Sequence, residues 1–133
     1  MPTSLGIDPQ IAILVADDYA LTREMLRSIL KQLGFGNVAA VEDGKKALAR
    51  IQEENYDLVI CDWNMPDMSG LEVLRAVRSD PRTRKLRFLM LTAEAYKENV
   101  VEAIKAGVSG YIVKPFTAQT LSDKIEEVFA KKP

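Results

Sequence analysis

Five short apolar runs alternate with five segments of helical spacing in this chain, and this alternation restricts the fold more than any other feature. The runs occupy residues 11–16, 37–41, 58–61, 88–91 and 110–113. Those at 11–16, 58–61 and 88–91 are apolar at every position, which is typical of strands covered on both faces. Strands that alternate with helices form right-handed crossovers between parallel neighbours. The sequence therefore predicts a doubly wound α/β domain with a five-stranded parallel sheet.

The segments between the runs predict helices that cover both faces of this sheet. Apolar residues recur at helical spacing in 21–33, 44–54, 71–78, 97–106 and a last segment after Thr117. Asp43 and Gly44 open the second of these helices, and Thr117 is expected to cap the last one. Residues 1–10 contain two prolines and a glycine and show no periodic pattern. We therefore expect a flexible lead-in over 1–10 and one domain over 11–131.

The residue types that the chain lacks exclude several kinds of site. There is no histidine, which excludes histidine-ligated zinc and a catalytic triad built on histidine. Cys61 is the only cysteine, so no internal disulfide forms, and its place in an apolar run predicts a buried thiol. The formal net charge of −1 gives no electrostatic case for binding nucleic acid or an anionic membrane. Because no run is long enough to span a membrane and no signal peptide is evident, a cytoplasmic location is expected.

Charged or hydroxylated side chains follow four of the predicted strands. Asp17 and Asp18 come directly after the first strand, Asp62 after the third, Thr92 after the fourth and Lys114 after the fifth. The carboxyl ends of parallel strands meet at one edge of the sheet, and ligands bind at that edge in open α/β folds. Three carboxylates in one cleft repel each other, and a cation relieves that repulsion. The pattern predicts a site for a hard cation and a transferable phosphoryl group.

Each of these residues has a chemical role in such a site. Asp18 and Asp62 are candidates for direct Mg²⁺ ligands, Asp17 for a ligand through water, and Asn64 for a backbone carbonyl ligand. A carboxylate can attack phosphorus and become an aspartyl-phosphate, and Asp62 is the best candidate because its strand is the central one. Lys114 can contact the oxygens of Asp62 and then those of the phosphoryl group, while the Thr92 hydroxyl offers a hydrogen-bond donor.

Structural roles compete with these assignments when each residue is taken alone. Asp17 and Asp18 can cap a turn or a helix, Asp62 can be a loop carboxylate, and Thr92 or Lys114 alone is unremarkable. Their joint position at one strand edge favours the site. Trp63 is either a partly exposed reporter beside the site or ordinary loop packing, and Tyr111 can pack inward or turn outward.

Four stretches of the sequence resemble a known family. They are VADDY at 15–19, CDWNMPDMSGLE at 61–72, LTAEAYKEN at 91–99 and GYIVKPFTAQTL at 110–121. Together they are similar to the receiver domains of two-component response regulators, and most of all to those of the CheY type in chemotaxis. The resemblance covers the chain from residue 11 to its last helix. It implies a flavodoxin-like (βα)5 fold with strand order 2-1-3-4-5.

The resemblance also implies roles for individual residues. Asp62 matches the phosphoacceptor, Asp17 and Asp18 the acidic pair around Mg²⁺, and Asn64 the residue whose carbonyl is a ligand. Thr92 matches the switch hydroxyl and Lys114 the phosphate-contacting lysine. Tyr111 matches the rotating switch aromatic. Lys114–Pro115 matches a peptide bond that is usually cis in this family. A partner-binding face is matched by Lys97, Tyr111 and Lys124.

By this resemblance, the expected function is that of a single-domain response regulator. It takes a phosphoryl group from a histidine kinase in a Mg²⁺-dependent reaction and signals by binding a protein target. The expected target is a flagellar motor switch protein, and a phosphatase is a further candidate partner. Such a protein is not an enzyme with a separate substrate, since it catalyses only its own phosphorylation and dephosphorylation. It is expected to be a monomer that binds neither nucleic acid nor membrane.

Other functions remain open at this stage. A receiver of another pathway, or a phosphate sink without a target, fits the same residues. A metal-dependent phosphatase with an aspartyl nucleophile commonly carries a second acid two residues later, and Asn64 stands at that position here. A flavin-binding module of similar topology needs a first loop rich in Gly, Ser and Thr, and ADDYALT is a poor match. Tyr19 and a less basic first helix depart from the resembled proteins. These departures leave the identity of the partner open, because kinase docking uses surfaces near the first helix.

Overall fold

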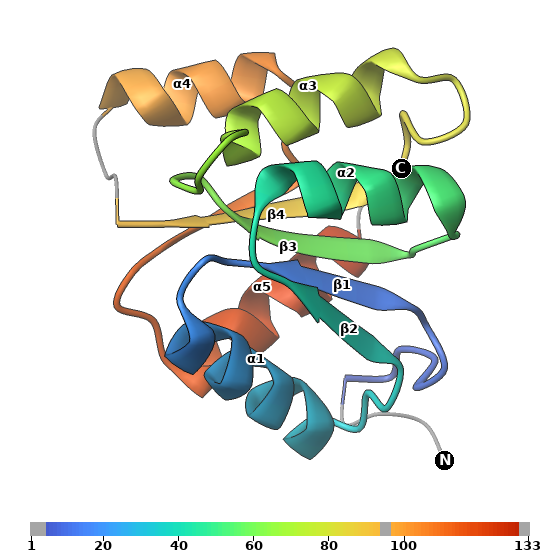
Figure 1. Ribbon diagram of the computed structural model, residues 1–133. Helices are drawn as coiled ribbons and strands as arrows, with labels where there is room; N and C mark the ends of the chain where they lie inside the picture. The colour runs from blue at the N-terminus through green and yellow to red at the C-terminus, as the bar shows by residue number, and fades with distance from the viewer. Residues whose placement is uncertain (1–4, 94–96, 131–133) are drawn as a thin grey trace.

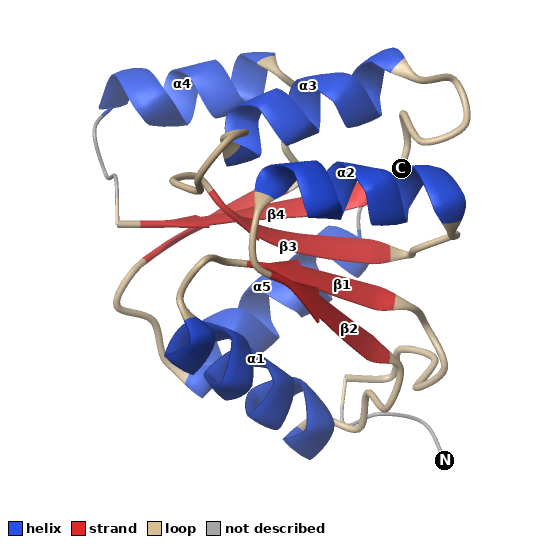
Figure 2. Ribbon diagram, viewed as in Figure 1, coloured by secondary structure: helices blue, strands red, loops and turns tan. Residues whose placement is uncertain are grey.

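A five-stranded parallel sheet forms the middle layer of the molecule in the computed structural model, which describes residues 5–93 and 97–130. Figure 2 shows the strands between two layers of helices. The strands are β1 (Ile13–Ala16), β2 (Val38–Val41), β3 (Leu58–Asp62), β4 (Arg87–Thr92) and β5 (Gly110–Val113). The helices are α1 (Ala20–Gln32), α2 (Gly44–Glu53), α3 (Gly70–Ser79), α4 (Lys97–Lys105) and α5 (Ala118–Ala130).

The strands lie in the order β2-β1-β3-β4-β5, and every pairing is parallel. This confirms the order implied by the family resemblance. β3 is the central strand, with Ala16 opposite Cys61 and Asp62 opposite Leu91 in the register. As a result, β1, β3 and β4 end at neighbouring positions on one edge of the sheet.

Two apolar clusters hold the helices on the two faces of the sheet (Figure 1). Alternate residues of each strand point to opposite faces. Ile13 and Val15 belong to the cluster beneath α1 and α5, whereas Leu14 and Ala16 belong to the one beneath α2 and α3. Burial on both faces explains why β1 carries no polar residue and β3 carries none before Asp62.

The predicted boundaries agree with the structure to within one or two residues. β1 begins two residues later than expected, because Ala12 bonds to the loop before β3 instead of to β2. Its N–H donates to Asp57 Oδ2 at 2.8 Å, and its carbonyl accepts from the Asp57 N–H at 2.8 Å. The run at 110–113 is a strand over its full predicted length.

Helix caps explain several of these boundaries. Thr117 Oγ1 accepts a hydrogen bond from the Thr120 N–H at 3.1 Å, as predicted for α5. Asp43, predicted to open α2, accepts one from the Lys46 N–H at 2.8 Å and caps that helix. α3 begins with a capping box that the sequence analysis did not identify. There the Ser69 hydroxyl and the Glu72 carboxylate each accept a bond from the other residue's N–H.

The lead-in contributes to the core where the structure describes it. Leu5 and Ile7 pack against the cluster beneath α1 and α5, although both stay partly exposed. The expected flexibility of residues 1–10 stays a prediction, and its first four residues lie outside the described part of the chain. Among the described residues, none of the helices is long and apolar enough to cross a membrane.

Gly70, the first residue of α3, lies directly against the end of β3. Its N–H donates to the Trp63 carbonyl at 2.8 Å, which closes the β3–α3 loop. A Cβ at this position would fall well inside van der Waals contact with the carbonyl oxygen of Asp62. The close approach of two backbones requires glycine here.

We expect Gly70→Ala to lower the free energy of unfolding by about 1–3 kcal/mol, because the new methyl group has to displace backbone at the end of β3. Urea denaturation of the two proteins measures this. Gly36→Ala is the matched control, since a Cβ there meets no atom within 4 Å. Equal losses in the two variants would contradict the close approach at Gly70.

Candidate functional site

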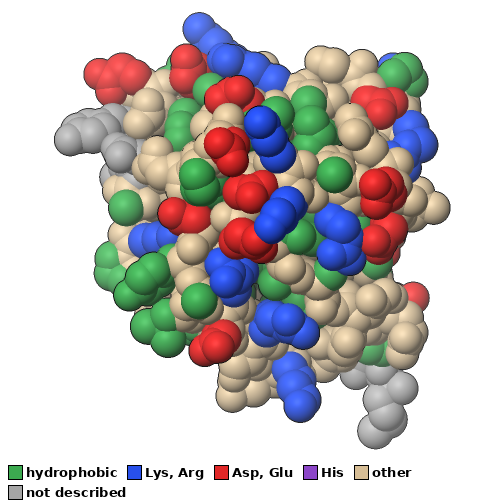
Figure 3. Space-filling model, in the orientation of Figure 1, with side chains coloured by type: hydrophobic (Ala, Val, Ile, Leu, Met, Phe, Trp, Pro, Cys, Tyr) green, Lys and Arg blue, Asp and Glu red, His purple; other side chains and the backbone are tan. Residues whose placement is uncertain are grey.

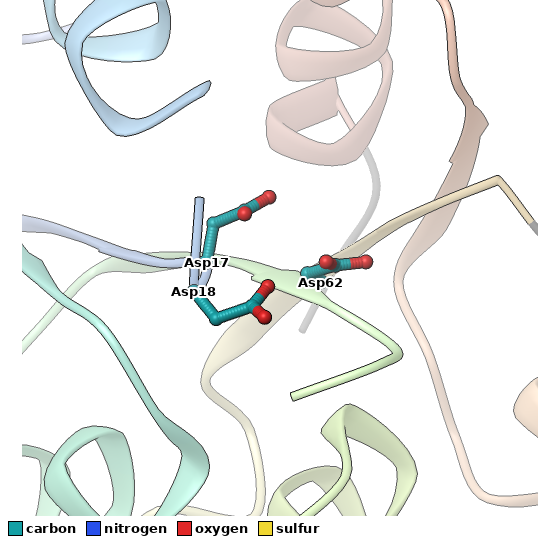
Figure 4. A group of neighbouring side chains, drawn as sticks. All are labelled: Asp17, Asp18 and Asp62. Carbon is teal, nitrogen blue, oxygen red and sulfur yellow. The ribbon is translucent and has the colours of Figure 1, made fainter. Parts of the chain in front are cut away.

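Three carboxylates meet beyond the ends of β1 and β3 (Figure 4). Asp17 and Asp18 follow the last residue of β1, and Asp62 is the last residue of β3. One carboxylate oxygen of each residue lies within 4.8 Å of the others. The structure thus brings together the three acids that the sequence analysis placed at one edge.

The three acids differ in their exposure to solvent. Asp17 is completely buried and Asp62 is 6% exposed, whereas Asp18 is exposed. Asp17 Oδ1 accepts a hydrogen bond from the Tyr19 N–H at 2.9 Å, which orients its carboxylate at the start of α1. Two acids of the cluster are therefore buried, and the third faces solvent.

Lys114 provides the positive charge of the cluster. Its Nζ lies 2.9 Å from Asp17 Oδ2 and 3.3 Å from Asp62 Oδ2. Its backbone N–H donates to the Thr92 carbonyl at 2.7 Å, so the ends of β4 and β5 stay together. The Lys114–Pro115 peptide bond is cis, as the family resemblance implied.

Burial and charge shift the pKa values of these groups. Burial is the main cause that raises the pKa of Asp62 to about 6, and the charge of Asp17 adds to the shift. Lys114 and a hydrogen bond from the Asn64 backbone oppose it. For Lys114, burial lowers the pKa, but the hydrogen bonds and charges of Asp17 and Asp62 outweigh burial and raise it.

The donor set suits a hard divalent cation. It consists of oxygen atoms alone, and three carboxylates face a single ammonium group. Mg²⁺ prefers oxygen ligands and is typically held by one or two carboxylates together with water and phosphate oxygens. Asp17, Asp18 and Asp62 are the side chains that would hold it. The Asn64 carbonyl as a further ligand stays a prediction.

Thr92 and Tyr111 lie close to the cluster on neighbouring strands. Thr92 is the last residue of β4 and is fully buried. Tyr111, in β5, is opposite Met90 of β4 and packs against the apolar cluster beneath α2 and α3. Its ring meets that of Trp63 edge to face, with centroids 6.5 Å apart. Tyr111 therefore packs inward here. Trp63 is half-buried, packs against Tyr111 and directly follows Asp62 in the chain.

Of the two lysines expected on a partner-binding face, the structure describes the side chain of one. Lys124 lies on α5 and its Nζ is 3.4 Å from Glu127 Oε2. Lys97 begins α4, but its side chain is outside the described part of the chain. The binding roles of Lys97, Tyr111 and Lys124 stay predictions.

Arg23 is a residue at the site that the sequence analysis missed. Its Nη1 donates to the backbone carbonyl of Asp17 at 2.8 Å, across the β1–α1 turn. An arginine six residues after an aspartate has no recognisable spacing signal, because the contact depends on how the turn folds back onto the helix.

An apolar surface adjoins the cluster. Figure 3 shows hydrophobic side chains grouped at the lower left of the molecule. Three exposed side chains belong to the β1–α1 turn and α1: Tyr19, Leu21 and Met25. Beside them is a hollow of about 360 Å³ whose walls include Met25, Phe116 and Lys114. Lys114 therefore contacts both the acidic cluster and this hollow.

Comparisons with known proteins agree with this arrangement. The family model for the response regulator receiver domain matches residues 13–126. The chemotaxis protein CheY of Pseudomonas aeruginosa is 48% identical over 119 residues, which are 90% of this chain and 96% of that protein. CheY-3 of Vibrio cholerae is 42% identical over 125 residues, which are 94% and 96% of the two chains. The solved structure of CheY4 of Vibrio cholerae superimposes with a TM-score of 0.83 at 35% identity, covering 90% of this chain and 98% of that one.

We expect Asp62→Asn to stabilise the metal-free protein at neutral pH. The pKa of Asp62 rises from 3.8 to about 6 on folding, so its ionised form favours the unfolded state. This destabilisation is absent below about pH 4 and complete above about pH 6. The variant should gain about 1–3 kcal/mol in the free energy of unfolding near pH 7, since one pKa unit corresponds to about 1.4 kcal/mol.

Urea denaturation with a chelator present, repeated from about pH 7 to about pH 4, measures this difference. The gain should shrink as the pH falls. Glu126→Gln, at an exposed position of α5, is the control and should show no such trend. A gain that is independent of pH would contradict the raised pKa.

Proposed function

The chain belongs to the response regulator receiver domain family, and from this premise we propose that it accepts a phosphoryl group on Asp62 and signals by binding a protein target. The convergence of Asp17, Asp18, Asp62 and Lys114 at one strand edge carries this proposal. The proposed donor is a phosphohistidine of a histidine kinase, which has to be another protein because this chain has no histidine.

The proposed reaction is a displacement at phosphorus. A carboxylate oxygen of Asp62 attacks, a P–O bond forms, and the P–N bond of phosphohistidine breaks with its electron pair left on the imidazole. The pKa of about 6 means that Asp62 is mostly ionised near pH 7 and yet more basic than an ordinary aspartate. Lys114, within 3.3 Å of that carboxylate, can follow the charge onto the phosphoryl oxygens.

Magnesium is part of the proposal. Asp17, Asp18 and Asp62, with the Asn64 carbonyl, would hold the ion, and it would supply positive charge to the phosphoryl oxygens. Asp17 is kept in position by Tyr19 and Arg23, so the chain presents its acids before any ligand arrives.

We place the switch in Thr92 and Tyr111. Phosphorylation adds about 1.5–2 negative charges and strong acceptors beside β4. The Thr92 hydroxyl is the proposed donor to those acceptors. Movement of the Thr92 side chain would open space into which Tyr111 could turn, away from Trp63. The phosphorylated state then shifts a pre-existing equilibrium between two conformations. The proposed output face carries Lys97, Tyr111 and Lys124.

The kinase is proposed to dock beside the cleft. The exposed Tyr19, Leu21 and Met25 and the neighbouring hollow form an apolar surface that shares Lys114 with the acidic cluster. A domain that presents phosphohistidine to Asp62 has to contact the molecule near this surface, so apolar burial there would align donor and acceptor.

Chemotaxis is the pathway that we propose. The support is the likeness to proteins named chemotaxis protein CheY, at 42–48% identity over most of both chains. The proposed target is a flagellar motor switch protein. A receiver of another pathway, or a phosphate sink, would share the same acidic cluster.

Incubation with acetyl phosphate and Mg²⁺ should add one phosphoryl group to the protein, and intact mass spectrometry detects it. Asp62→Asn should abolish the label, because Asp62 is the proposed nucleophile, and a chelator should prevent labelling of the unchanged protein. Asp123→Asn, at an exposed residue of α5, is the matched control and should label normally. Equal labelling of Asp62→Asn at another residue would overturn the assignment.

Binding to the motor switch protein should depend on phosphorylation. A pull-down with the protein in beryllofluoride and Mg²⁺, a phosphoryl mimic, should retain a flagellar motor switch protein more strongly than the untreated protein does. Asp62→Asn under the same conditions is the control. Retention of other partners alone, or of none, would indicate another pathway or a phosphate sink.

A further inference from the structure

A cluster of basic side chains lies at the opposite edge of the sheet from the acidic site. Residues 78–87 contain five basic residues and one acidic residue, a net charge of +4, so the rest of the chain carries −5. We call Arg82, Arg84, Lys85 and Arg87 the basic rim. Figure 1 shows the α3–β4 connection that carries them on the right of the view, where the strands begin.

A polar hollow of about 210 Å³ opens beside the basic rim. Its walls come from the end of α2, the α2–β3 connection and the α3–β4 connection, and they include Arg82, Lys85 and Arg87. This volume fits one side chain of a partner rather than a cofactor, since small-molecule sites usually measure about 300–1,000 Å³.

Two of the four basic side chains are held in place by hydrogen bonds to other elements. Arg82 Nη2 donates to the Ile51 carbonyl at 2.6 Å, which ties the α3–β4 connection to α2. Arg87 Nε donates to the Val128 carbonyl at 3.2 Å, and its guanidinium lies 4.3 Å from the ring centroid of Phe129. The hollow is therefore held open by hydrogen bonds between elements.

The other two basic side chains are available to a ligand. Arg84 and Lys85 are exposed and make no hydrogen bond or ion pair within residues 5–93 and 97–130. Glu54 and Asp57, the acids that line the hollow, form no ion pair with either of these side chains. Glu54 is bonded to Arg50 at 2.8 Å, and Asp57 Oδ2 accepts from the Ala12 N–H.

We propose that the basic rim and its hollow bind an acidic peptide segment of a partner protein, with one side chain in the hollow and further carboxylates on Arg84 and Lys85. Single exposed ion pairs contribute only about 0–1 kcal/mol each, so the ligand has to make several contacts at once. A small anion could not do so. A nucleic acid fits less well, because the cations come from residues 82–87 alone, whereas phosphodiester binding needs a longer basic track.

Fluorescence anisotropy with a short labelled peptide rich in glutamate tests this proposal at about 0.1 M salt, where the Debye length is about 10 Å. The double variant Arg84→Glu and Lys85→Glu should weaken binding by at least about tenfold, because two attractions become repulsions. Both side chains are exposed, so the fold should persist, and phosphorylation with acetyl phosphate provides an independent check of folding.

The control double variant is Arg27→Glu and Lys45→Glu, which makes the same change in net charge at two exposed positions elsewhere. It should bind the peptide within about twofold of the unchanged protein, since long-range charge effects are screened by salt. Equal losses in the two double variants would overturn the proposal, because the binding would then follow net charge alone. So would the absence of peptide binding to the unchanged protein.

Two further ligands decide the class of partner. A peptide with glutamine in place of glutamate should not bind, and equal binding would overturn the role of carboxylates. Single-stranded DNA of similar length should bind more weakly than the acidic peptide. Tighter binding of DNA, lost in the Arg84→Glu and Lys85→Glu variant, would overturn the assignment to an acidic peptide.

Discussion

The ammonium group of Lys114 holds together two buried carboxylates that would otherwise repel each other, and the candidate site depends on that contact. Asp17 and Asp62 are almost inaccessible to water, which makes their charges costly, and Lys114 lies within 3.3 Å of both. Burial, and then the charge of Asp17, still raise the pKa of Asp62, because one ammonium does not outweigh them. The uncompensated negative charge makes a cation a favourable ligand. The repulsion between the carboxylates therefore destabilises the ligand-free fold and favours a bound cation.

The sequence was sufficient to predict the sheet and the members of the acidic cluster because both follow from position along the chain. β3 is apolar until Asp62, and in a parallel sheet the residue at the end of a buried strand has to lie at the common edge. The alternation of strands and helices settled the crossovers. The strand order, by contrast, came from the family resemblance, since apolar patterning does not say which parallel strands are neighbours.

Other features depended on how loops fold back, and no sequence pattern indicated them. Arg23 reaches the Asp17 carbonyl only because the turn brings the second turn of α1 over the end of β1. Arg78 likewise donates to the Gly107 and Leu86 carbonyls, at 2.8 and 2.6 Å, across two connections that are distant in sequence. Arginine side chains are long enough to satisfy carbonyls of several loops, and no periodic pattern indicates such contacts. The partly buried Leu5 and Ile7 were missed because a segment without a repeat gives no sign of packing.

These arginine contacts also explain why the two edges of the sheet can carry different chemistry. At the edge where the strands end, buried carboxylates are kept near one another by Lys114. At the edge where they begin, the connections are held by guanidinium groups that donate to carbonyls at the end of α2 and in the α3–β4 connection, notably Arg82 to Ile51 and Arg78 to Leu86. Because these bonds hold the loops, Arg84 and Lys85 need take no part in holding the structure and can remain exposed. A surface whose charges are not required for folding is free to be used for recognition, and that is the physical basis for assigning the basic rim to a partner.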